Sequence, residues 1–568
     1  MQFSIFYIKL LLKIEIIKNI SLNVKKMKAL NDNIRPKNYK LHFDLLDGEE
    51  FNGEAEITLE CAKECNELKL NGKNLKITHA ELNQEKITDI SYQPDLILIK
   101  CNLPAGKQVL RLKFSGRYGK VTGLYKSHYQ DKFIYTTQFE AAHARECFPC
   151  VDEPEAKATF DLSITVNEGF MGISNTKIIE EKTSEGQTTF TFATSPKMST
   201  YLLYIGAGEL EYIEEEHNKV RVRIITVPGK AEKMGQFAME ASKKFLTYFE
   251  EYFAIKYPLD KLDMIAVPDF SSGAMENWGA ITYREDALLY DSEVSSLAAK
   301  QRIAEIISHE LVHQWFGNLV TMKWWNDLWL NESFADYMAY KAVAHHYPEM
   351  DPWAEFLTSR VGSAFFLDAL DSSHPINVKV NSPVEIREVF DAISYSKGGM
   401  VLRMLENYIG EDVFKQGLQS YLEKYSYDNA EGNDLWEEIG KVTDKPVQEM
   451  MDNWLDQMGF PLIEVCKSEN GFKLLQKRFQ FIDKNDDKKW IVPISTSEGY
   501  VLLKDKEESV ELKNAKINLG QKGFYRVKYD HATLSEIKKE FSSLEAIDQW
   551  GLFSDLFALL LGTKIPLA

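Results

Sequence analysis

Two histidines four residues apart, with a glutamate between them, form the pattern in this sequence that most clearly predicts chemistry. They are His309 and His313, with Glu310, in the stretch HELVHQWFGN. On a helix, residues four apart lie on the same face, so both imidazoles can bind one zinc ion. Glu310 is rotated by about 100° and can reach a water molecule on that ion instead. The pattern therefore predicts metal-assisted hydrolysis with two ligands and a general base.

A catalytic zinc site needs a third protein ligand and one open position. The next helical pattern, WWNDLWLNESFADYMAYKAV, has Glu332 as its first acidic residue. We expect the first helix to end near Gly317 and a second helix, starting near Asn331, to return antiparallel and bring Glu332 to the ion. Asp336, one turn further on, is predicted to accept the free ring N–H of a ligand histidine. Taken alone, Glu332 would be interpreted as a solvated charge in the first turn of a helix.

The elements that must position this site begin with a β-rich region. In YKLHFDL the apolar residues Tyr39, Leu41, Phe43 and Leu45 alternate with polar ones, which is typical of a half-buried strand. The segments FNGEAEITLE, VLRLKF and TFDLSITV follow the same alternation. These patterns predict a mostly antiparallel β domain over residues 30–210, with its boundary at the acidic segment EYIEEEHNK.

The remainder of the chain is predicted to be multidomain α+β. Apolar residues recur at helical spacing in AMEASKKFLTYFEEYF and QRIAEIISHELVHQWF, with a buried strand, LDMIAVP, between them, so residues 211–459 should be rich in helix. Strand patterns return over residues 460–530 and predict a small β-sandwich. Residues 531–568, with the apolar WGLFSDLFALLLG, are interpreted as the start of a helical domain that is incomplete here, with an apolar face left exposed.

Residues 1–29 do not fit these domains. Their apolar run is interrupted by Lys9, Lys13, Glu15 and Lys18, so it matches neither a spanning helix nor a secretory signal. Because MKALNDN at Met27 offers a second start, we interpret this segment as an artefactual or disordered extension.

Composition limits the possible partners and the compartment. The formal net charge of −18 disfavours nucleic acid and anionic membrane surfaces and favours cationic ligands. Six cysteines in 568 residues form no disulfide framework, which predicts a reducing, cytoplasmic location. Cys147 and Cys150 form a CxxC pair, but no second pair follows at zinc-binding spacing, so we interpret it as structural.

Four motifs in this order resemble the zinc aminopeptidases of the aminopeptidase N family. They are GAMENWGAITYRE, HELVHQWFGN, NESFADY and ISYSKGGMVLRML, and the match is closest to the puromycin-sensitive and archaeal tricorn-interacting branches. The resemblance extends from about Asn33 to Phe557. It implies a saddle-like N-terminal β domain, a thermolysin-like catalytic domain of the gluzincin type, a β-sandwich and a helical C-terminal domain.

The resemblance also implies roles for residues outside the zinc pattern. The GAMEN segment, Gly273, Ala274, Met275, Glu276 and Asn277, would bind substrate, with Glu276 holding the free α-ammonium. In the segment TTQFEAAHARECFPCVDEP, Glu140 would be a second contact for the amine, and Gln138 would line the pocket for the first side chain. Tyr395 would donate a hydrogen bond to the oxyanion.

The hypothesis is a zinc-dependent aminopeptidase that hydrolyses the N-terminal residue from peptides by attack of a zinc-bound water. Its metal ligands are His309, His313 and Glu332, with one Zn2+ per chain, and Glu310 and Tyr395 are catalytic. Its substrates are peptides with a free N-terminus, and a functional link to a large cytosolic protease is implied. Two alternatives stay open, a thermolysin-like endopeptidase and a non-catalytic scaffold that retains the fold. Within the family, the epoxide-hydrolase branch has GGMEN where this chain has GAMEN.

Overall fold

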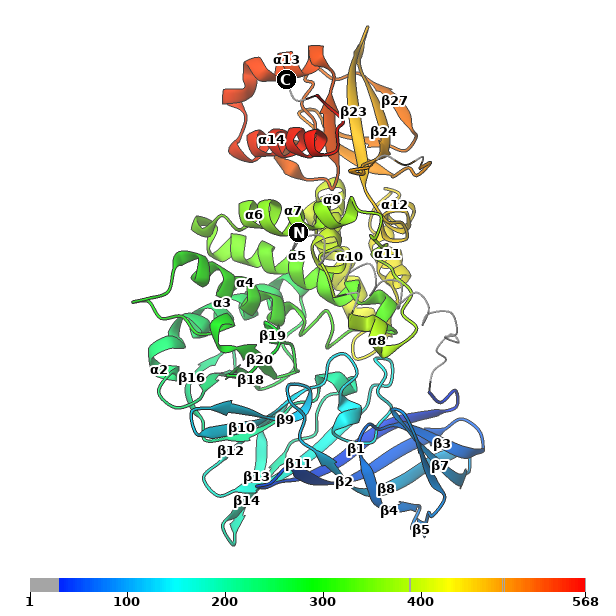
Figure 1. The fold of residues 1–568 in the computed structure, drawn as a ribbon, viewed down its shortest axis with the longest axis vertical. Coiled ribbons are helices and arrows are strands. Elements are labelled where there is room, and N and C mark those ends of the chain that lie inside the picture. Colours follow the sequence, from blue (N-terminus) through cyan, green and yellow to red (C-terminus); the bar gives the residue numbers. More distant parts are fainter. Residues whose placement is uncertain (1–29, 388–389, 483, 485, 567–568) are drawn as a thin grey trace, which may run out of the picture.

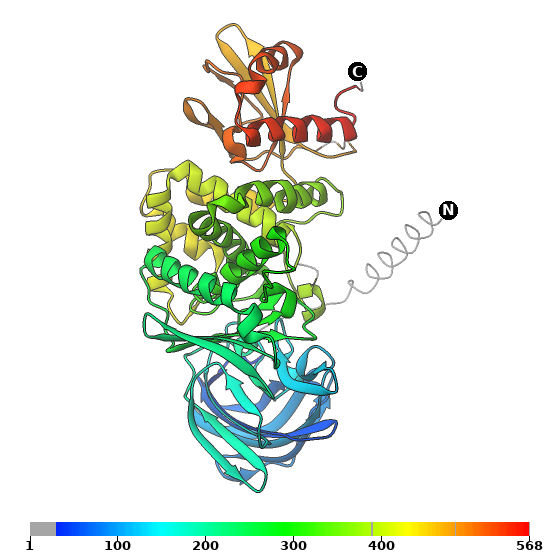
Figure 2. The ribbon, with the colours of Figure 1, turned by 90° about the vertical axis from the view of Figure 1, so that its left-hand side faces the viewer.

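The computed structural model describes residues 30–387, 390–482, 484 and 486–566. The predicted extension over residues 1–29 lies outside this range. Three tiers follow one another along the long axis: a β-rich N-terminal tier, a mostly helical middle tier, and a third tier with further strands and two helices (Figure 1). The view turned by 90° shows the same order (Figure 2). The chain is therefore multidomain α+β, as predicted.

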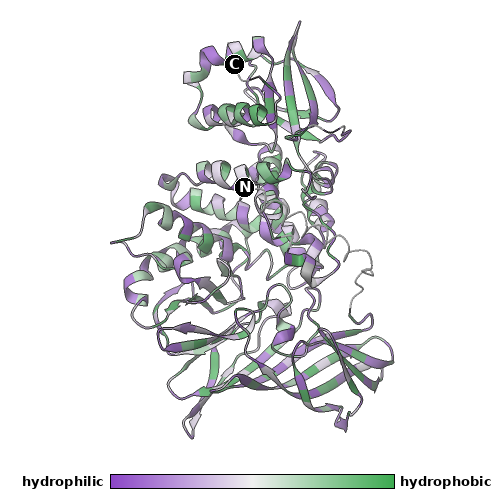
Figure 3. Ribbon diagram, in the orientation of Figure 1, coloured by the Kyte–Doolittle hydropathy of each residue, from purple (hydrophilic) through white to green (hydrophobic). Residues whose placement is uncertain are grey.

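The N-terminal tier is built on an eight-stranded sheet with the order β13-β14-β11-β1-β2-β8-β4-β5. Its outer strands are β13 (Ile178–Ser184) and β14 (Gln187–Phe192) on one side, and β4 (Lys76–Leu82) and β5 (Glu85–Lys86) on the other. Its centre contains β1 (Ile34–Leu45), β2 (Glu50–Cys61) and β8 (Gly106–Arg117), which pair antiparallel, while β1 pairs parallel with β11 (Thr159–Asn167). The predicted alternation along β1 is confirmed, because Tyr39, Leu41, Phe43 and Leu45 are all buried. Hydropathy alternates along these strands (Figure 3).

Two smaller sheets complete this tier. One has the order β12-β15-β10-β9, with β12 (Met171–Ser174), β15 (Ile205–Gly208) and β9 (Gly123–Tyr129). The other has the order β3-β7-β6, with β3 (Cys65–Asn71), β7 (Leu96–Leu103) and β6 (Ile90–Gln93). The strand β10 (Lys132–Gln138) matters most for function, because it leads directly into Phe139 and Glu140.

The middle tier combines a five-stranded sheet with long helices. The sheet order is β16-β17-β18-β20-β19, and its strands are β16 (Glu211–His217), β17 (Val220–Thr226), β18 (Lys261–Val267), β20 (Ala280–Arg284) and the short β19 (Ala274–Met275). The acidic segment predicted as a boundary forms the edge strand β16 and pairs with β17. The buried strand predicted at LDMIAVP is β18.

Two long helices of the middle tier, α4 (Leu297–Val312) and α5 (Trp329–His346), pack against each other. The helix α3 (Gln236–Phe253) packs against α4, and α9 (Gly398–Ile409) packs against α5. Fourteen of the residues of α5 are buried, and they include the polar residues Asn331, Glu332, Ser333 and Asp336. The helix therefore runs through the interior and carries functional side chains at fixed positions.

The third tier begins with β23 (Pro461–Ser468), which lies in a sheet with the order β27-β24-β23-β28. The other strands of this sheet are β24 (Gly471–Arg478), β27 (Glu507–Val510) and β28 (Arg526–Tyr529), and β25 (Val492–Thr496) forms a separate pair with β26 (Gly499–Leu503). Two helices follow, α13 (His531–Glu540) and α14 (Ala546–Leu561). On α14, Phe553, Phe557 and Leu561 are exposed, which agrees with the expected exposed apolar face. Among the residues described, no helix combines the length and apolar character needed to cross a bilayer.

A buried charge cluster ties β17 to β18. Both oxygens of the Asp263 carboxylate accept hydrogen bonds from Arg223 at 2.7 Å, and Lys261 Nζ lies 2.7 Å from Oδ2. Burial opposes ionisation of Asp263, but the two cations outweigh it and lower the pKa of the carboxyl. Burial in turn lowers the pKa of Lys261 to about 8. The three groups depend on one another, since each alone would be an unpaired buried charge.

We expect Asp263→Asn to lower the free energy of unfolding by about 3–5 kcal/mol, because it leaves two cations without their buried partner. Chemical denaturation followed by tryptophan fluorescence measures this loss. The matched control is Asp260→Asn, which removes a half-exposed ion pair with Lys177 and should cost less than about 1 kcal/mol. Equal decreases in the free energy of unfolding in the two variants would show that the buried cluster stabilises the fold no more than an exposed ion pair.

Candidate metal centre and active site

The helices α4 and α5 bring the three predicted metal ligands together. The two Nε2 atoms of His309 and His313 lie 3.1 Å apart, and Glu332 Oε2 lies 3.2 Å from the first and 3.5 Å from the second. The three ligand atoms form a group that could hold a metal ion. All three side chains are largely or completely buried, so they share one enclosed point.

The outer nitrogen of each imidazole is already engaged. His313 Nδ1 lies 2.9 Å from the carbonyl oxygen of Phe316, and His309 Nδ1 lies 3.2 Å from Asp336 Oδ1, the partner expected for it. Because both of these oxygens only accept hydrogen bonds, each Nδ1 carries a proton, and in the neutral rings each Nε2 presents a lone pair. Two nitrogen lone pairs facing a carboxylate oxygen fit a divalent cation such as Zn2+.

The chain between the two helices turns earlier than expected. The helix α4 ends at Val312, not near Gly317, although His313 keeps a right-handed helical conformation as its C-cap. Gly317 has a φ of +132°, a conformation that side chains disfavour, and a Cβ there would lie 3.2 Å from His313 Nδ1. The expected antiparallel return still occurs, because α5 starts at Trp329 and Glu332 falls in its first turn.

A cavity of about 310 Å³ contains these ligands and most of the other predicted residues. Its lining includes the predicted residues Glu140, Gly273, Ala274, Glu276, Glu310 and Tyr395. A side chain at Gly273 would meet no atom within 4 Å, because this residue borders open space. Gln138 lines an adjoining cavity of about 690 Å³, which shares Glu140, Ser272 and Phe390 with the first.

Two predicted residues do not line either cavity. Met275 and Asn277 are buried, and Met275 Sδ accepts a 3.5 Å hydrogen bond from Gln138 Nε2. Asn277 Nδ2 donates to Thr282 Oγ1 at 3.2 Å, across the turn that joins β19 to β20. Both residues therefore contact the site through their neighbours, and their predicted roles in substrate binding stay predictions.

Buried carboxylates without hydrogen-bond partners are the main electrostatic feature of the cavity. Within the described residues, Oε1 of Glu140, Oε1 of Glu276 and Oε2 of Glu310 are all buried and have no partner. Burial raises the pKa of Glu140 well above its ordinary value, and the nearby Glu276 raises it further. Burial also raises the pKa of Glu276 and, although both histidines oppose it, takes that of Glu310 to about 8. A bound cation would give these buried oxygens a partner, so the cavity favours cationic ligands.

The backbone of Glu276 is held from the α4 side. Its carbonyl oxygen accepts a 2.8 Å hydrogen bond from Asn318 Nδ2 and a 3.3 Å bond from Gln314 Nε2. Gln314 follows His313 directly and Asn318 lies four residues further along, so the turn after α4 also fixes the segment carrying Glu276. Glu276, Glu310 and His313 form a second close group of possible ligand atoms.

Tyr395 lies against His309 of α4. Its ring stacks on that of His309, with 6.1 Å between centroids and an interplanar angle of 10°. Burial raises the pKa of its hydroxyl well above the ordinary value, and Glu332 adds to the rise. The hydroxyl therefore stays protonated and available as a donor.

Several cavity residues were missed by sequence reasoning. They are Ser272, Arg302, Glu305, Ile306, Ala339, Tyr340, Arg360 and Phe390. Burial and the nearby Glu355 raise the pKa of Glu305 to about 7, and Glu305 accepts a 3.3 Å hydrogen bond from the hydroxyl of Tyr340. Helical periodicity could have indicated Arg302 and Glu305, which precede His309 by seven and four residues. Nothing in the sequence indicated Arg360.

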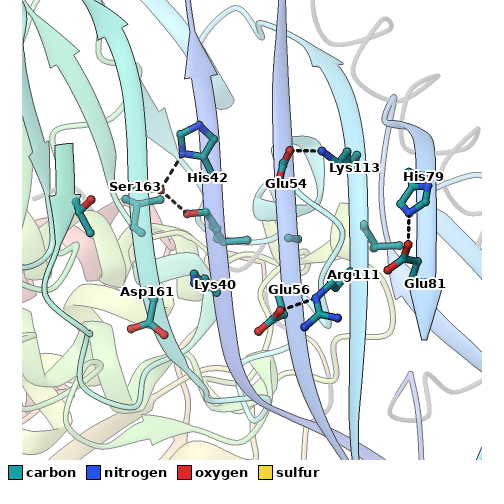
Figure 4. Close-up of a pocket in the computed structure, with 15 residues that line it drawn as sticks. Lys40, His42, Glu54, Glu56, His79, Glu81, Arg111, Lys113, Asp161 and Ser163 are labelled. Atoms are coloured by element: carbon teal, nitrogen blue, oxygen red, sulfur yellow. Dashed lines mark hydrogen bonds and ion pairs between the residues drawn. The ribbon is translucent and has the colours of Figure 1, made fainter. Parts of the chain in front are cut away.

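A hollow of about 380 Å³ over the eight-stranded sheet has a different character (Figure 4). There Glu54 pairs with Lys113 at 2.6 Å and Glu56 with Arg111 at 2.7 Å, each directly across two strands. These carboxylates are matched by cations and half exposed. The hollow is thus a solvated strand face, whereas the 310 Å³ cavity holds unmatched buried carboxylates.

Comparison with known proteins agrees with this geometry. Residues 35–202 match the Peptidase M1 N-terminal domain, and residues 237–454 match the Peptidase family M1 domain. The chain is 40% identical to a leucyl aminopeptidase of Saccharolobus solfataricus over 91% of its length and 66% of that protein. It is 41% identical to the puromycin-sensitive aminopeptidase of Caenorhabditis elegans over 91% of its length and 59% of that protein.

A third relative is tricorn protease-interacting factor F2 of Thermoplasma acidophilum. The identity is 39%, over 93% of this chain and 67% of that protein. The chain thus spans between 59% and 67% of the length of these three relatives.

We expect Glu332→Gln to weaken zinc binding by more than the roughly 10–100-fold that loss of an outer partner such as Asp336 typically costs. The amide keeps the shape of the side chain but removes the anionic ligand. Metal content after dialysis against graded chelator concentrations measures the effect. The matched control is Glu305→Gln, which lines the same cavity one helical turn away and should retain zinc. Unchanged zinc affinity in the Glu332 variant would refute the ligand set.

Proposed function

Since the chain belongs to peptidase family M1, we propose that it is a zinc-dependent aminopeptidase, a hydrolase that removes the N-terminal residue of peptides. One observation carries the proposal. The buried group formed by His309, His313 and Glu332 lies in the same cavity as the unpartnered carboxylates of Glu140 and Glu276. A metal site alone supports peptide hydrolysis, whereas the added carboxylates support recognition of a charged chain end.

The amine-binding role of Glu276 and Glu140 follows from charge balance. A protonated α-amine beside two buried carboxylates satisfies oxygen atoms that otherwise lack partners. At 4 Å and an effective dielectric of about 20, one such pair gains roughly 4 kcal/mol before the desolvation cost. The ammonium would therefore fix which peptide bond is presented to the metal site.

His309, His313 and Glu332 would hold one zinc ion per chain, which supplies Lewis acidity towards the scissile carbonyl and acidifies water. Glu310 is the proposed general base. It takes a proton from the attacking water and returns it to the departing amine, so one carboxyl group serves both halves of the reaction. The burial that raises the pKa of Glu310 also keeps the side chain in the cavity, and a cation in the metal site pulls that pKa down.

Tyr395 is the proposed oxyanion donor. Negative charge develops on the carbonyl oxygen in the transition state, and a hydroxyl that stays protonated can donate to it. Loss of one such donor typically costs about 10²–10³ in rate. Gln138, which lines the adjoining cavity, is proposed to contact the side chain of the first substrate residue.

The finer architecture and the cellular setting are also part of the proposal. We assign residues 30–210 to a saddle-like β domain, 211–459 to a thermolysin-like catalytic domain, 460–530 to a β-sandwich and 531–568 to helical structure. A cytoplasmic location is supported by six cysteines that are all free thiols. A functional link to a large protease is supported by the relative that is named for its interaction with tricorn protease.

We expect activity on peptides with a free amino terminus and a loss of at least about 100-fold when that terminus is acetylated, because acetylation removes the positive charge that Glu140 and Glu276 are proposed to bind. Release of the first residue, followed by mass spectrometry, measures this. Glu310→Gln should lower kcat by about 10²–10⁴ while zinc is retained. This loss would show that the activity does not come from a contaminating peptidase. Internal cleavage of acetylated peptides at the wild-type rate would favour an endopeptidase instead.

We expect a bell-shaped pH profile of kcat/KM. The reaction needs Glu310 deprotonated, so activity rises as the pH increases through the pKa of Glu310, which the bound cation holds below the value of about 8 that burial gives it. It also needs the substrate amine protonated, so activity falls as the pH passes the amine pKa of about 7.7–8.0. A substrate whose amine is made more acidic by nearby fluorine should shift only the alkaline limb to lower pH. If the alkaline limb stays at the same pH when the pKa of the substrate amine is lowered, recognition of the ammonium is excluded.

A further inference from the structure

Tyr395 does not lie on an ordinary helix. It is the third residue of η9 (Ile393–Lys397), a π-helical turn that runs directly into α9. The wider turn lets Lys397 N reach Ala392 O at 2.9 Å, and Tyr395 N donates to Asp391 O at 3.1 Å. Single π turns are rare and are less stable than α-helix, so they need external support.

The side chain of Asp391 supports the start of this turn. Its Oδ1 accepts a 2.8 Å hydrogen bond from the backbone N–H of Ile393 and a 3.2 Å bond from that of Ser394. These are the first backbone donors of the turn, which lack partners inside it. A carboxylate is a strong acceptor for such groups, so Asp391 fixes the end of the turn from which Tyr395 projects.

His374 holds the second oxygen of the same carboxylate. Its Nε2 lies 2.9 Å from Asp391 Oδ2, and its Nδ1 lies 2.7 Å from the carbonyl oxygen of Pro375. Both partners only accept hydrogen bonds, so both ring nitrogens must carry protons, and His374 is an imidazolium in this arrangement. Burial opposes that charge, but the bond to Asp391 outweighs it and raises the pKa of His374.

The other supports of the turn are more deeply buried. Ser333 Oγ, beside Glu332 on α5, donates to Ser394 O at 2.6 Å. At the far end, Lys397 Nζ pairs with Asp368 at 2.8 Å and donates to Gly459 O at 3.1 Å, with both charged side chains fully buried. The pair of His374 and Asp391 is less enclosed, at 23% and 30% side-chain exposure, so it can be altered without opening the core.

From these contacts we propose that Asp391 and His374 are positioning residues for Tyr395, acting as an ion-paired clamp on the π turn that aims its hydroxyl into the metal cavity. The ring of Tyr395 already stacks on His309, so a shift of the turn changes the distance between the hydroxyl and the metal ligands. Neither Asp391 nor His374 lines the cavity, and their effect is transmitted through the backbone. The inference rests on the proposed aminopeptidase function.

The first test compares His374→Gln and Asp391→Asn with wild type in the zinc-loaded full chain. Each variant keeps the size of the side chain but removes one charge of the clamp. We expect kcat to fall about tenfold with KM within about twofold, because misplacing a catalytic group by less than 1 Å has effects of this order. The matched control is His79→Gln, which removes a similar pair with Glu81 at 2.8 Å on the N-terminal sheet and should leave both constants unchanged.

The second test separates positioning from general stability. In a Tyr395→Phe background, His374→Gln should cause no further loss of kcat, because there is no hydroxyl left to aim. An equal tenfold loss in that background would overturn the proposal, as would a wild-type kcat in both clamp variants. The unfolding temperature of each protein must lie above the assay temperature. If His374→Gln fails to fold, Asp391→Asn decides the test, because its side chain keeps an oxygen for the backbone donors. An inactive wild type with zinc bound would refute the proposed function, whereas an active one with unaffected variants would refute only the clamp.

Discussion

The concentration of buried negative charge between α4 and α5 is the constraint on which the rest of the structure depends. Glu140, Glu276, Glu310 and Glu332 share one enclosed cavity, and besides burial the charge of Glu332 raises the pKa values of the other three. Two imidazoles alone cannot balance this charge. The arrangement is stable as a set of carboxylates only with cations present. Under the proposed function, a divalent metal and a substrate ammonium would supply three positive charges opposite these four carboxylates.

This constraint explains why the β-rich tier is part of the site. Glu140 comes from the end of β10, and the buried Lys157 donates hydrogen bonds of 3.2 Å and 3.1 Å to the carbonyl oxygens of Asn318 and Leu319. Asn318 in turn holds the backbone of Glu276. Burial lowers the pKa of Lys157, so keeping this side chain charged costs free energy. The hydrogen bonds of Lys157 to the loop offset part of that cost. The two tiers therefore share one polar network.

Much of this could be predicted from sequence because the signals were local. Strict alternation from Tyr39 to Leu45 predicted β1, and the four-residue spacing of His309 and His313 predicted a shared helix face. The end of α4 was misplaced, because the turn depends on the left-handed conformation of Gly317 and on contacts with Tyr201 from another tier. The π turn around Tyr395 was not predicted either, since Asp391, His374 and Ser333 meet only in the folded chain.

The position of the unmatched carboxylates has one more implication. Glu140 and Glu276 lie at fixed positions relative to the metal ligands. Under the proposed function, the scissile bond is therefore selected by its distance from the substrate amine and depends little on the substrate sequence. Each cleavage exposes a fresh ammonium on the shortened peptide, and that product can bind in the same register as its predecessor. Degradation would then proceed as a ladder of single steps, halting where a residue fits the adjoining cavity poorly.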